Sequence, residues 1–222
     1  MSRVIALLGA ESTGKTTLAH GLVQQLAVGG RRVALVSEYL REFCDRHGRT
    51  PHQDEQRHIA DEQTHRIAAA ARTHDLVIAD TTALMIAVYS DTVFGDTGLY
   101  ASAETAHRNG VELTLLTALD LPWQADGLQR DGPHVREPVD ARVRAALARA
   151  QIDHSVVFGQ GEARLQAALA SVQRALAPPP VDVDAATGPA RWHWHCERCG
   201  DANCERHARL PNLGHRSENG SR

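Results

Sequence analysis

The sequence is poor in aromatic residues, which make up 4% of its 222 residues, and it has no long apolar run. A helix that spans a bilayer needs about 20 consecutive apolar residues, so we expect no membrane partner. The formal net charge of -3 offers no general attraction to nucleic acid or to anionic lipid. No signal-peptide cleavage site follows the short apolar run at the N-terminus, and the sequence therefore predicts a cytoplasmic protein.

Cysteine is also scarce. Of the four cysteines, Cys44 stands alone, whereas Cys196, Cys199 and Cys204 lie close together near the C-terminus. In a reducing compartment such a cluster indicates a metal site sooner than disulfide bonds.

What the sequence does contain is a regular alternation of strand and helix patterns. Short apolar runs predict strands at residues 3–9, 31–39, 75–82, 111–120 and 154–159. Apolar residues at helical spacing, or strong helix formers, predict helices at residues 15–28, 51–73, 139–151 and 162–176. This order is typical of an α/β fold in which helices cover both faces of a parallel sheet.

A phosphate-binding motif lies between the first strand and the first helix. The stretch GAESTGKT at residues 9–16 fits the pattern G-x-x-x-x-G-K-[ST]. In such a loop backbone N–H groups cradle the phosphates of ATP, the lysine reaches the β- and γ-phosphates, and the last hydroxyl binds Mg²⁺. The alternative is a tight glycine turn with a surface lysine. We assign nucleotide binding to Gly9, Glu11, Ser12, Thr13, Gly14, Lys15, Thr16 and Thr17.

Acidic residues follow two other predicted strands. Asp80 ends the run LVIAD, where a carboxylate can hold Mg²⁺ beside the phosphate loop, although a strand ending in Asp often marks only a turn. Glu38 ends the run VALVSE, at the sheet edge where such folds bind ligands, and could accept a proton from an acceptor hydroxyl. Arg41 could pair with phosphate or with Glu42. The alternative for these three residues is a solvated helix start.

The segment DLPWQADGLQRDG at residues 120–132 has the composition of a mobile lid. A lid arginine that closes over the γ-phosphate excludes water and suppresses hydrolysis. Arg130 is the first candidate and Arg136 the second. The alternative for each is a surface salt bridge.

Four blocks together resemble a known family. LLGAESTGKTTL, SEYLREF, VIADTT and DLPWQADGLQRDG occur in the order and at the separations found in the ribosylnicotinamide kinase domain of NadR. Over residues 3 to about 176, the resemblance implies a P-loop kinase fold with a five-stranded parallel core. It implies ATP-dependent phosphorylation of nicotinamide riboside to nicotinamide mononucleotide. By the same resemblance Glu38, Tyr39 and Arg41 lie near the acceptor, Asp80 is the metal-side acid, and Asp126, Gly127 and Arg130 belong to the lid.

Two functions from different classes follow. The first is a small-molecule kinase that acts on a nucleoside, with Lys15, Glu38, Asp80 and Arg130 as catalytic residues. The second is a regulatory P-loop ATPase or nucleotide switch whose tail binds a partner. Repressor and adenylyltransferase functions of NadR proteins are not transferred. Rings that could stack on the base of an acceptor, or simply belong to the core, are Tyr39, Tyr89, Phe94, Tyr100 and Trp123.

Beyond the kinase-like domain at residues 1–176, the composition changes. Residues 177–190 are rich in Pro and Ala and predict a linker, residues 191–210 form a compact Cys/His block, and residues 211–222 predict a disordered tail. Cys196, Cys199, Cys204 and His207 have the spacing of a structural zinc knuckle. His193 or His195 could replace His207, and the whole tail could instead be disordered. A knuckle of this kind could contact a protein or a nucleic acid.

Overall fold

A computed structural model describes residues 2–124 and 132–177 of the chain. In this part, five parallel strands form one sheet in the order β2-β3-β1-β4-β5, which confirms the predicted five-stranded parallel sheet. The strands are β1 (Arg3–Leu8), β2 (Val33–Val36), β3 (Leu76–Asp80), β4 (Leu113–Thr117) and β5 (His154–Val157).

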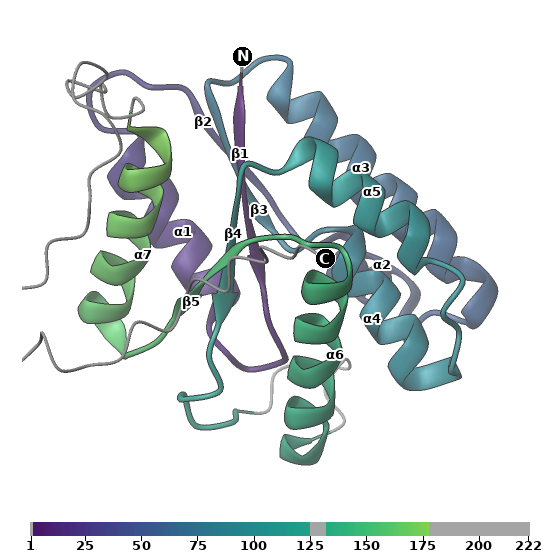
Figure 1. The fold of residues 1–222 in the computed structure, drawn as a ribbon. Helices are drawn as coiled ribbons and strands as arrows, with labels where there is room; N and C mark the ends of the chain where they lie inside the picture. Colours follow the sequence, from purple (N-terminus) through teal and green to yellow (C-terminus); the bar gives the residue numbers. More distant parts are fainter. Residues whose placement is uncertain (1, 125–131, 178–222) are drawn as a thin grey trace, which may run out of the picture. The chain divides into compact units, whose positions relative to one another are not determined.

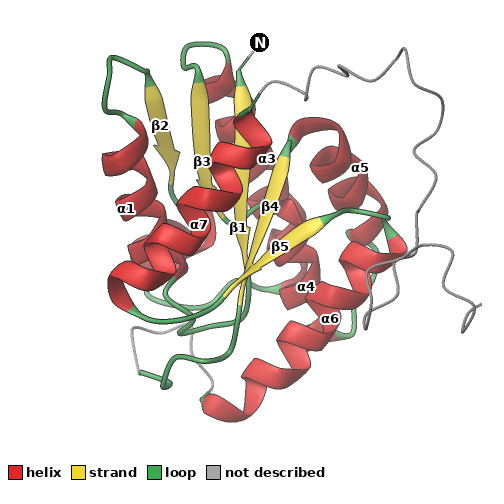
Figure 2. Ribbon diagram, turned by 60° about the vertical axis from the view of Figure 1, so that its left-hand side comes forward, coloured by secondary structure: helices red, strands yellow, loops and turns green. Residues whose placement is uncertain are grey.

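Helices cover both faces of this sheet. Helices α1 and α7 lie on one face and helices α3 and α5 on the other, while α4 packs against α3, α5 and α6 (Figures 1 and 2). The predicted three-layer α/β architecture is therefore confirmed. The helices are α1 (Lys15–Leu26), α2 (Tyr39–His47), α3 (Gln56–Ala71), α4 (Ala83–Phe94), α5 (Tyr100–Gly110), α6 (Arg136–Arg149) and α7 (Gly161–Leu176), and short 3-10 helices span Gln53–Glu55 and Pro133–Val135.

The sequence-based assignment differed from the structure in the length of one strand and in three missing helices. The strand predicted at residues 31–39 is shorter, because β2 ends at Val36 and Tyr39 is already the first residue of α2. Helices α2, α4 and α5 were not predicted as elements. In α4 the six residues Ala83–Val88 are all buried, so the segment has no polar face from which a helical period could be recognised.

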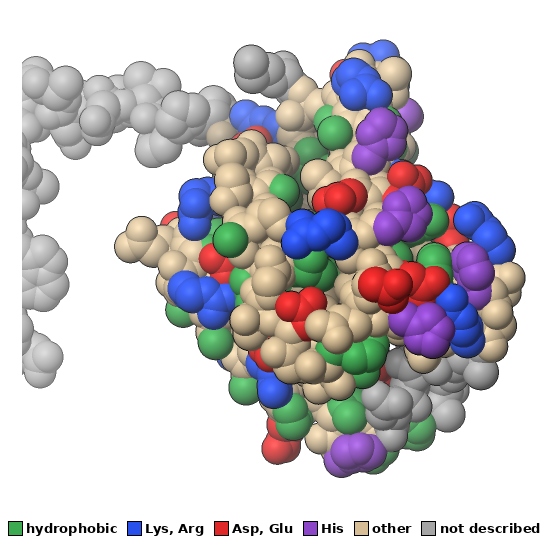
Figure 3. Space-filling model, turned by 90° about the vertical axis from the view of Figure 1, so that its right-hand side faces the viewer, with side chains coloured by type: hydrophobic (Ala, Val, Ile, Leu, Met, Phe, Trp, Pro, Cys, Tyr) green, Lys and Arg blue, Asp and Glu red, His purple; other side chains and the backbone are tan. Residues whose placement is uncertain are grey.

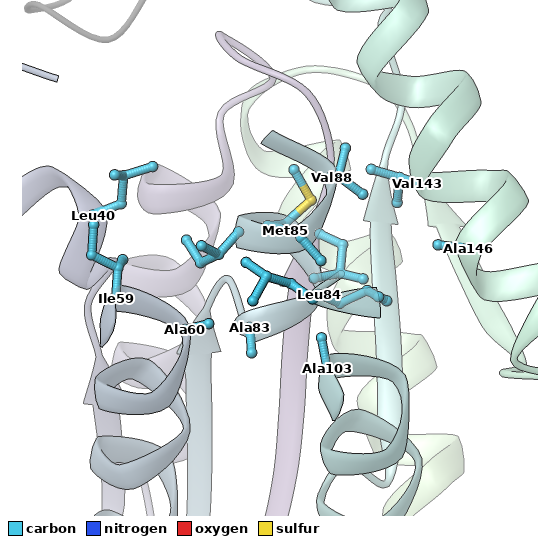
Figure 4. Packing of buried hydrophobic residues seen from close by; sticks show 14 of the residues in the cluster. Leu40, Ile59, Ala60, Ala83, Leu84, Met85, Val88, Ala103, Val143 and Ala146 are labelled. Carbon is cyan, nitrogen blue, oxygen red and sulfur yellow. The ribbon is translucent and has the colours of Figure 1, made fainter. Parts of the chain in front are cut away.

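The largest buried cluster lies around α4. The side chain of Met85 is fully buried between α3, α5 and α6, among residues labelled in Figure 4 that include Ile59, Ala103 and Val143. Burying a side chain of this size stabilises the fold by roughly 1.5–3 kcal/mol. A second cluster, which includes Leu22 and Val172, joins α1 and α7 to the opposite face of the sheet.

The strand register places three segments at one edge of the sheet. Leu7 pairs with Asp80 and Leu8 pairs with Leu116, so the carboxyl ends of β1, β3 and β4 lie level with one another. In open parallel sheets, ligands bind outside this carboxyl edge. The phosphate loop, Asp80 and the segment after β4 are therefore brought together by the register alone.

The sequence of α3 has only a thin apolar face because most of this helix is at least partly exposed. Arg57, His58, Asp61 and His65 are exposed, and charged and histidine side chains are spread over the side of the molecule shown in Figure 3. Four residues of α3 are buried, and two of them are glutamines: Gln56, Ile59, Ala60 and Gln63. No helix in the described ranges is long and apolar enough to cross a membrane.

A buried histidine joins α5 to the segment after β3. His107 is 2% exposed, its Nδ1 lies 3.0 Å from Thr82 Oγ1, and its Nε2 lies 2.8 Å from Thr114 Oγ1. The Thr82 hydroxyl also accepts a hydrogen bond from Leu84 N and so caps α4. Because burial penalises the charged ring, the pKa of His107 falls from 6.5 to about 4.

This shift makes the stability of the fold depend on pH. Below pH 6.5 His107 becomes protonated in the unfolded chain, whereas in the folded protein it stays neutral down to about pH 4. The free energy of unfolding therefore decreases as the pH falls from 6.5 to about 4. The full loss is about 3 kcal/mol. In urea unfolding from pH 7.5 to 4, the free-energy advantage of wild type over His107→Gln should shrink with falling pH.

The matched control is His154→Gln, at an exposed position of β5. Its difference from wild type should follow no comparable trend. An advantage of wild type over His107→Gln that stays constant with pH would contradict the assignment of a neutral, buried imidazole.

Candidate active site

The loop between β1 and α1 depends on two glycines. Gly9 has φ 144°, and a Cβ at this position would lie 2.1 Å from Thr117 Oγ1. Gly14 is the N-cap of α1 with a left-handed φ of 75°. Both positions therefore exclude other residues, the first by space and the second by backbone conformation.

Two threonine hydroxyls hold this loop on the sheet. Thr117 Oγ1 lies 3.1 Å from Leu8 O, to which it donates, and 2.7 Å from Thr13 Oγ1. Thr13 Oγ1 also donates to Ala10 O at 2.8 Å. The end of β4 thus fixes both the entry to the loop and its centre.

Lys15 is not a surface lysine. Its side chain is 8% exposed and folds back over the loop, where Nζ donates to Gly9 O and to Ala10 O, each at 2.9 Å. The structure therefore excludes the alternative of a glycine turn with a solvated lysine. In loops of this pattern the lysine ammonium group faces the phosphates of a bound nucleotide.

Thr16 and Asp80 form a pair of oxygen donors next to the loop. Thr16 Oγ1 donates to Asp80 Oδ2 at 2.6 Å, and Asp80 is 2% exposed. Its second oxygen, Oδ1, is buried and has no hydrogen-bond partner within residues 2–124 and 132–177. A buried carboxylate oxygen without a donor costs free energy unless a ligand satisfies it. Hard oxygen donors suit Mg²⁺, so the residues present fit the predicted ion.

The block SEYLREF, at residues 37–43, adds a second buried carboxylate. Glu38 is 7% exposed and is the N-cap of α2, and Arg41 Nε lies 4.0 Å from Glu38 Oε2. Glu42 instead pairs with Arg66 at 2.7 Å. Glu38 is thus a buried carboxylate, whereas the Arg41 side chain is 39% exposed in the first turn of α2, so its role stays a prediction.

The Tyr39 ring is packed against α3. The residue is 5% exposed, the Arg66 guanidinium lies 4.3 Å from the ring centroid, and the ring meets His58 edge-on. Its role near the acceptor stays a prediction.

Tyr100 is held in the core by its hydroxyl, which donates to Asp91 Oδ2 at 3.0 Å. Burial, together with Asp91, raises the pKa of Tyr100. Of the other candidate rings, Tyr89 and Trp123 are half-buried and Phe94 is exposed.

A cleft of about 1130 Å³ lies over the phosphate loop. It runs from the loop and the first turns of α1 to the start of α7, and its wall includes Lys15, Thr16, Arg41 and Leu121. Small-molecule sites commonly enclose ~300–1,000 Å³, so this cleft has room for a nucleotide with a further group beside it.

The start of the predicted lid is attached to the loop. Gln124 N donates to Ser12 Oγ at 2.8 Å, and Arg136 Nη1 donates to Leu121 O at 2.9 Å. Arg136 is 8% exposed, and its Nε and Nη2 atoms are buried with no acceptor in the described residues. The second lid candidate is thus a buried cation with donors to spare, whereas Asp126 and Arg130 lie outside the described residues.

Sequence reasoning missed Arg164, in the first turn of α7. Its Nη2 donates to Thr13 O at 2.9 Å, and its Nη1 donates to Gly159 O and Asp120 Oδ1, each at 2.8 Å. Burial opposes the charge of Asp120, but the hydrogen bonds from Arg164 and Gly159 N outweigh it and hold the Asp120 pKa below its ordinary value. No local pattern predicts the contacts with Thr13 and Asp120, because these two partners lie in loops far from Arg164 in the sequence.

The four predicted zinc ligands, Cys196, Cys199, Cys204 and His207, lie outside the described residues, as do the predicted linker and tail from residue 178 onward. Within the described part, no group of three or more His, Cys, Asp or Glu side chains could hold a metal ion.

Comparison with solved structures identifies the fold. A NadR protein in complex with NR matches with a TM-score of 0.63 and 18% identity, over 78% of this chain and 49% of that chain. A NadR protein in complex with NAD and AMP-PNP matches with a TM-score of 0.61, 18% identity and the same coverage. A thymidylate kinase from Ehrlichia chaffeensis matches with a TM-score of 0.52 and 15% identity, over 78% of this chain and 98% of that chain.

These likenesses confirm, for the fold, the resemblance to the NadR kinase domain. The chain spans about half the length of the NadR chains it matches. Curated protein sequences include no significant match. A family model described as an AAA domain matches residues 4–164, which extend from β1 to Arg164 and contain the loop, Glu38, Asp80 and Arg136. The chain therefore belongs to this AAA domain family.

Proposed function

We propose that this protein is an ATP-dependent kinase that transfers the γ-phosphoryl group of ATP to a hydroxyl of a small-molecule nucleoside. Nicotinamide riboside is the first candidate acceptor, since the chain resembles the NadR kinase domain and a NadR structure was determined with NR. The observation that carries the proposal is the ion pair between Arg41, in the wall of the phosphate cleft, and the buried carboxylate of Glu38.

That ion pair joins two halves of a transfer site. Lys15, Thr16 and Asp80 form the half that binds phosphate and metal, and Mg²⁺ held there would neutralise charge on the transferring group. Glu38 supplies the other half, because a carboxylate beside the phosphates can orient an acceptor hydroxyl and take its proton. The new bond then joins the acceptor oxygen to the γ-phosphorus, and ADP leaves with the old bridging oxygen.

Arg136 is placed to assist phosphoryl transfer. Its Nε and Nη2 atoms are buried and have no acceptor within residues 2–124 and 132–177, and its Nη1 donates to Leu121 O at the start of the lid. A cation held there can bind charge that develops on the phosphoryl oxygens as the site closes. Arginines also assist hydrolysis in nucleotide switches, so the feature that favours a kinase over a switch is the buried carboxylate of Glu38, which a switch does not need.

The test is ATP turnover by the full chain against a panel of nucleosides, with product analysis. Strong stimulation by one nucleoside, together with formation of its monophosphate, is the expected result. Turnover that no nucleoside stimulates, with inorganic phosphate as the sole product, would instead favour the regulatory ATPase.

Glu38→Gln should separate acceptor chemistry from ATP binding. The amide cannot accept the acceptor proton, so kcat should fall roughly 100-fold or more while ATP affinity changes little. Calorimetric titration of ATP beside steady-state kinetics measures both quantities. Glu42→Gln is the matched control, since Glu42 pairs with Arg66. Loss of ATP binding in Glu38→Gln would remove Glu38 from the acceptor side.

Asp80→Asn should affect the metal instead. The amide oxygen of Asn still accepts the hydrogen bond from the Thr16 hydroxyl, but the negative charge that attracts Mg²⁺ is lost. The Mg²⁺ concentration needed for half-maximal ATP binding should therefore rise roughly tenfold or more. Nucleotide binding titrated at several Mg²⁺ concentrations measures this shift without any turnover. An unchanged Mg²⁺ requirement would show that Asp80 serves only the hydrogen bond to Thr16.

A further inference from the structure

One buried side chain bridges the two segments that follow β2 and β3, next to the candidate carboxylates. Gln63 lies in the middle of α3 and is 0% exposed. Its Oε1 accepts a hydrogen bond from Tyr39 N at 2.8 Å, and its Nε2 donates to Ser37 O at 3.3 Å and to Thr81 O at 3.4 Å. All three partners are backbone groups at the carboxyl edge of the sheet.

The partners of Gln63 are neighbours in sequence of the two candidate carboxylates. Ser37 and Tyr39 flank Glu38 directly, and Thr81 directly follows Asp80. Val36 pairs with Ala79 in the register of β2 and β3, so both segments leave the sheet side by side. The hydrogen-bond ladder between β2 and β3 ends at this pair. The side-chain amide of Gln63 then forms hydrogen bonds with the backbone of the following residues, as a neighbouring strand would do.

The segment after β3 also needs an external restraint. Thr81 has a φ of 75°, a left-handed conformation that is costly for a β-branched residue. Its N–H donates to Leu7 O at 3.1 Å and its C=O accepts from Gln63. Hydrogen bonds on both sides of the Thr81 backbone hold this conformation and with it the direction in which Asp80 leaves the strand.

We propose that Gln63 is a positioning residue that sets the separation between Glu38 and Asp80, and so between the acceptor hydroxyl and the metal-bound phosphate. Gln63 acts only through the backbone of Ser37, Tyr39 and Thr81. This inference rests on the proposed kinase function, because it concerns the geometry of transfer. Small displacements of reacting groups lower the rate strongly while leaving remote binding intact.

Helix α3 offers a matched control. Gln56 is on the same buried face, two turns earlier, and is 4% exposed. Its Oε1 is buried and has no hydrogen-bond partner in the part of the chain that the structure describes. At both positions Gln→Met replaces the amide with an apolar side chain of similar size. Only at Gln63 does this change remove three hydrogen bonds to the backbone.

The first readout is kinetic, with ATP and the nucleoside that stimulates turnover. Gln63→Met should lower kcat roughly 10- to 100-fold with KM for ATP nearly unchanged, because the phosphate loop is not touched. Gln56→Met should leave both parameters close to wild type. Equal losses in the two variants, or wild-type kcat in Gln63→Met, would overturn the proposal.

The second readout does not depend on activity. Hydrogen exchange of the Tyr39 amide should become at least roughly tenfold faster in Gln63→Met and stay unchanged in Gln56→Met, since only the first variant removes the acceptor of that amide. If no nucleoside is phosphorylated by wild type, the proposed function fails while this arm still reports on the restraint. Faster exchange with unaltered kcat would show that the restraint does not position the site.

A conservative variant guards against loss of the fold. Gln63→Glu keeps an acceptor for Tyr39 N–H and should retain the protection of that amide. Its kcat should lie between those of Gln63→Met and wild type, because a fully buried site favours the protonated carboxyl group, which accepts from Tyr39 N and can donate to one of the two carbonyl oxygens. A kcat for Gln63→Glu no higher than that of Gln63→Met, with the Tyr39 amide protected in the former, would overturn the proposal.

Discussion

The site depends on one close approach, in which the hydroxyl of Thr117 occupies the space that Gly9 leaves empty. A Cβ at Gly9 would lie 2.1 Å from Thr117 Oγ1, so the loop can pass over the end of β4 only if residue 9 is glycine. That hydroxyl bonds to Leu8 O and lies within hydrogen-bond distance of Thr13 Oγ1. This contact fixes the first half of the loop, including the carbonyl groups of Gly9 and Ala10 that hold Lys15, while the left-handed Gly14 sets the start of α1.

Two long side chains extend the same principle to the rest of the carboxyl edge. Gln63 comes from the helix on one face of the sheet and bonds to the backbone around Glu38 and Asp80. Arg164 comes from α7 on the other face and bonds to Thr13 O in the loop and to Asp120 after β4. Chain segments that have left the sheet, and so lack ladder partners, are thus held by side chains from helices.

Features that depend on neighbouring residues could be predicted from the sequence, whereas contacts between residues distant in the sequence could not. The five strands and the loop were predictable, because apolar runs and the GKT motif are local. Helix α4 was not, since a segment buried on all sides has no amphipathic period. The location of Arg136 was suggested by its proximity to the lid motif, but its burial was not. Gln63 carries no local signal, and neither do the contacts of Arg164 with Thr13 and Asp120, because those partners are distant in the sequence and only the folded chain brings them together.

The central position of β1 has a consequence for how the protein is made. Arg3 pairs with Leu76 on one side of β1, and Ile5 pairs with Leu113 on the other. A ribosome therefore releases the first strand long before either neighbour exists. The contacts of Thr117 with the phosphate loop cannot form until residue 117 has been synthesised. Until β3 and β4 are present, both edges of the apolar strand β1 lack hydrogen-bond partners. Such long-range pairing slows folding and exposes intermediates to aggregation.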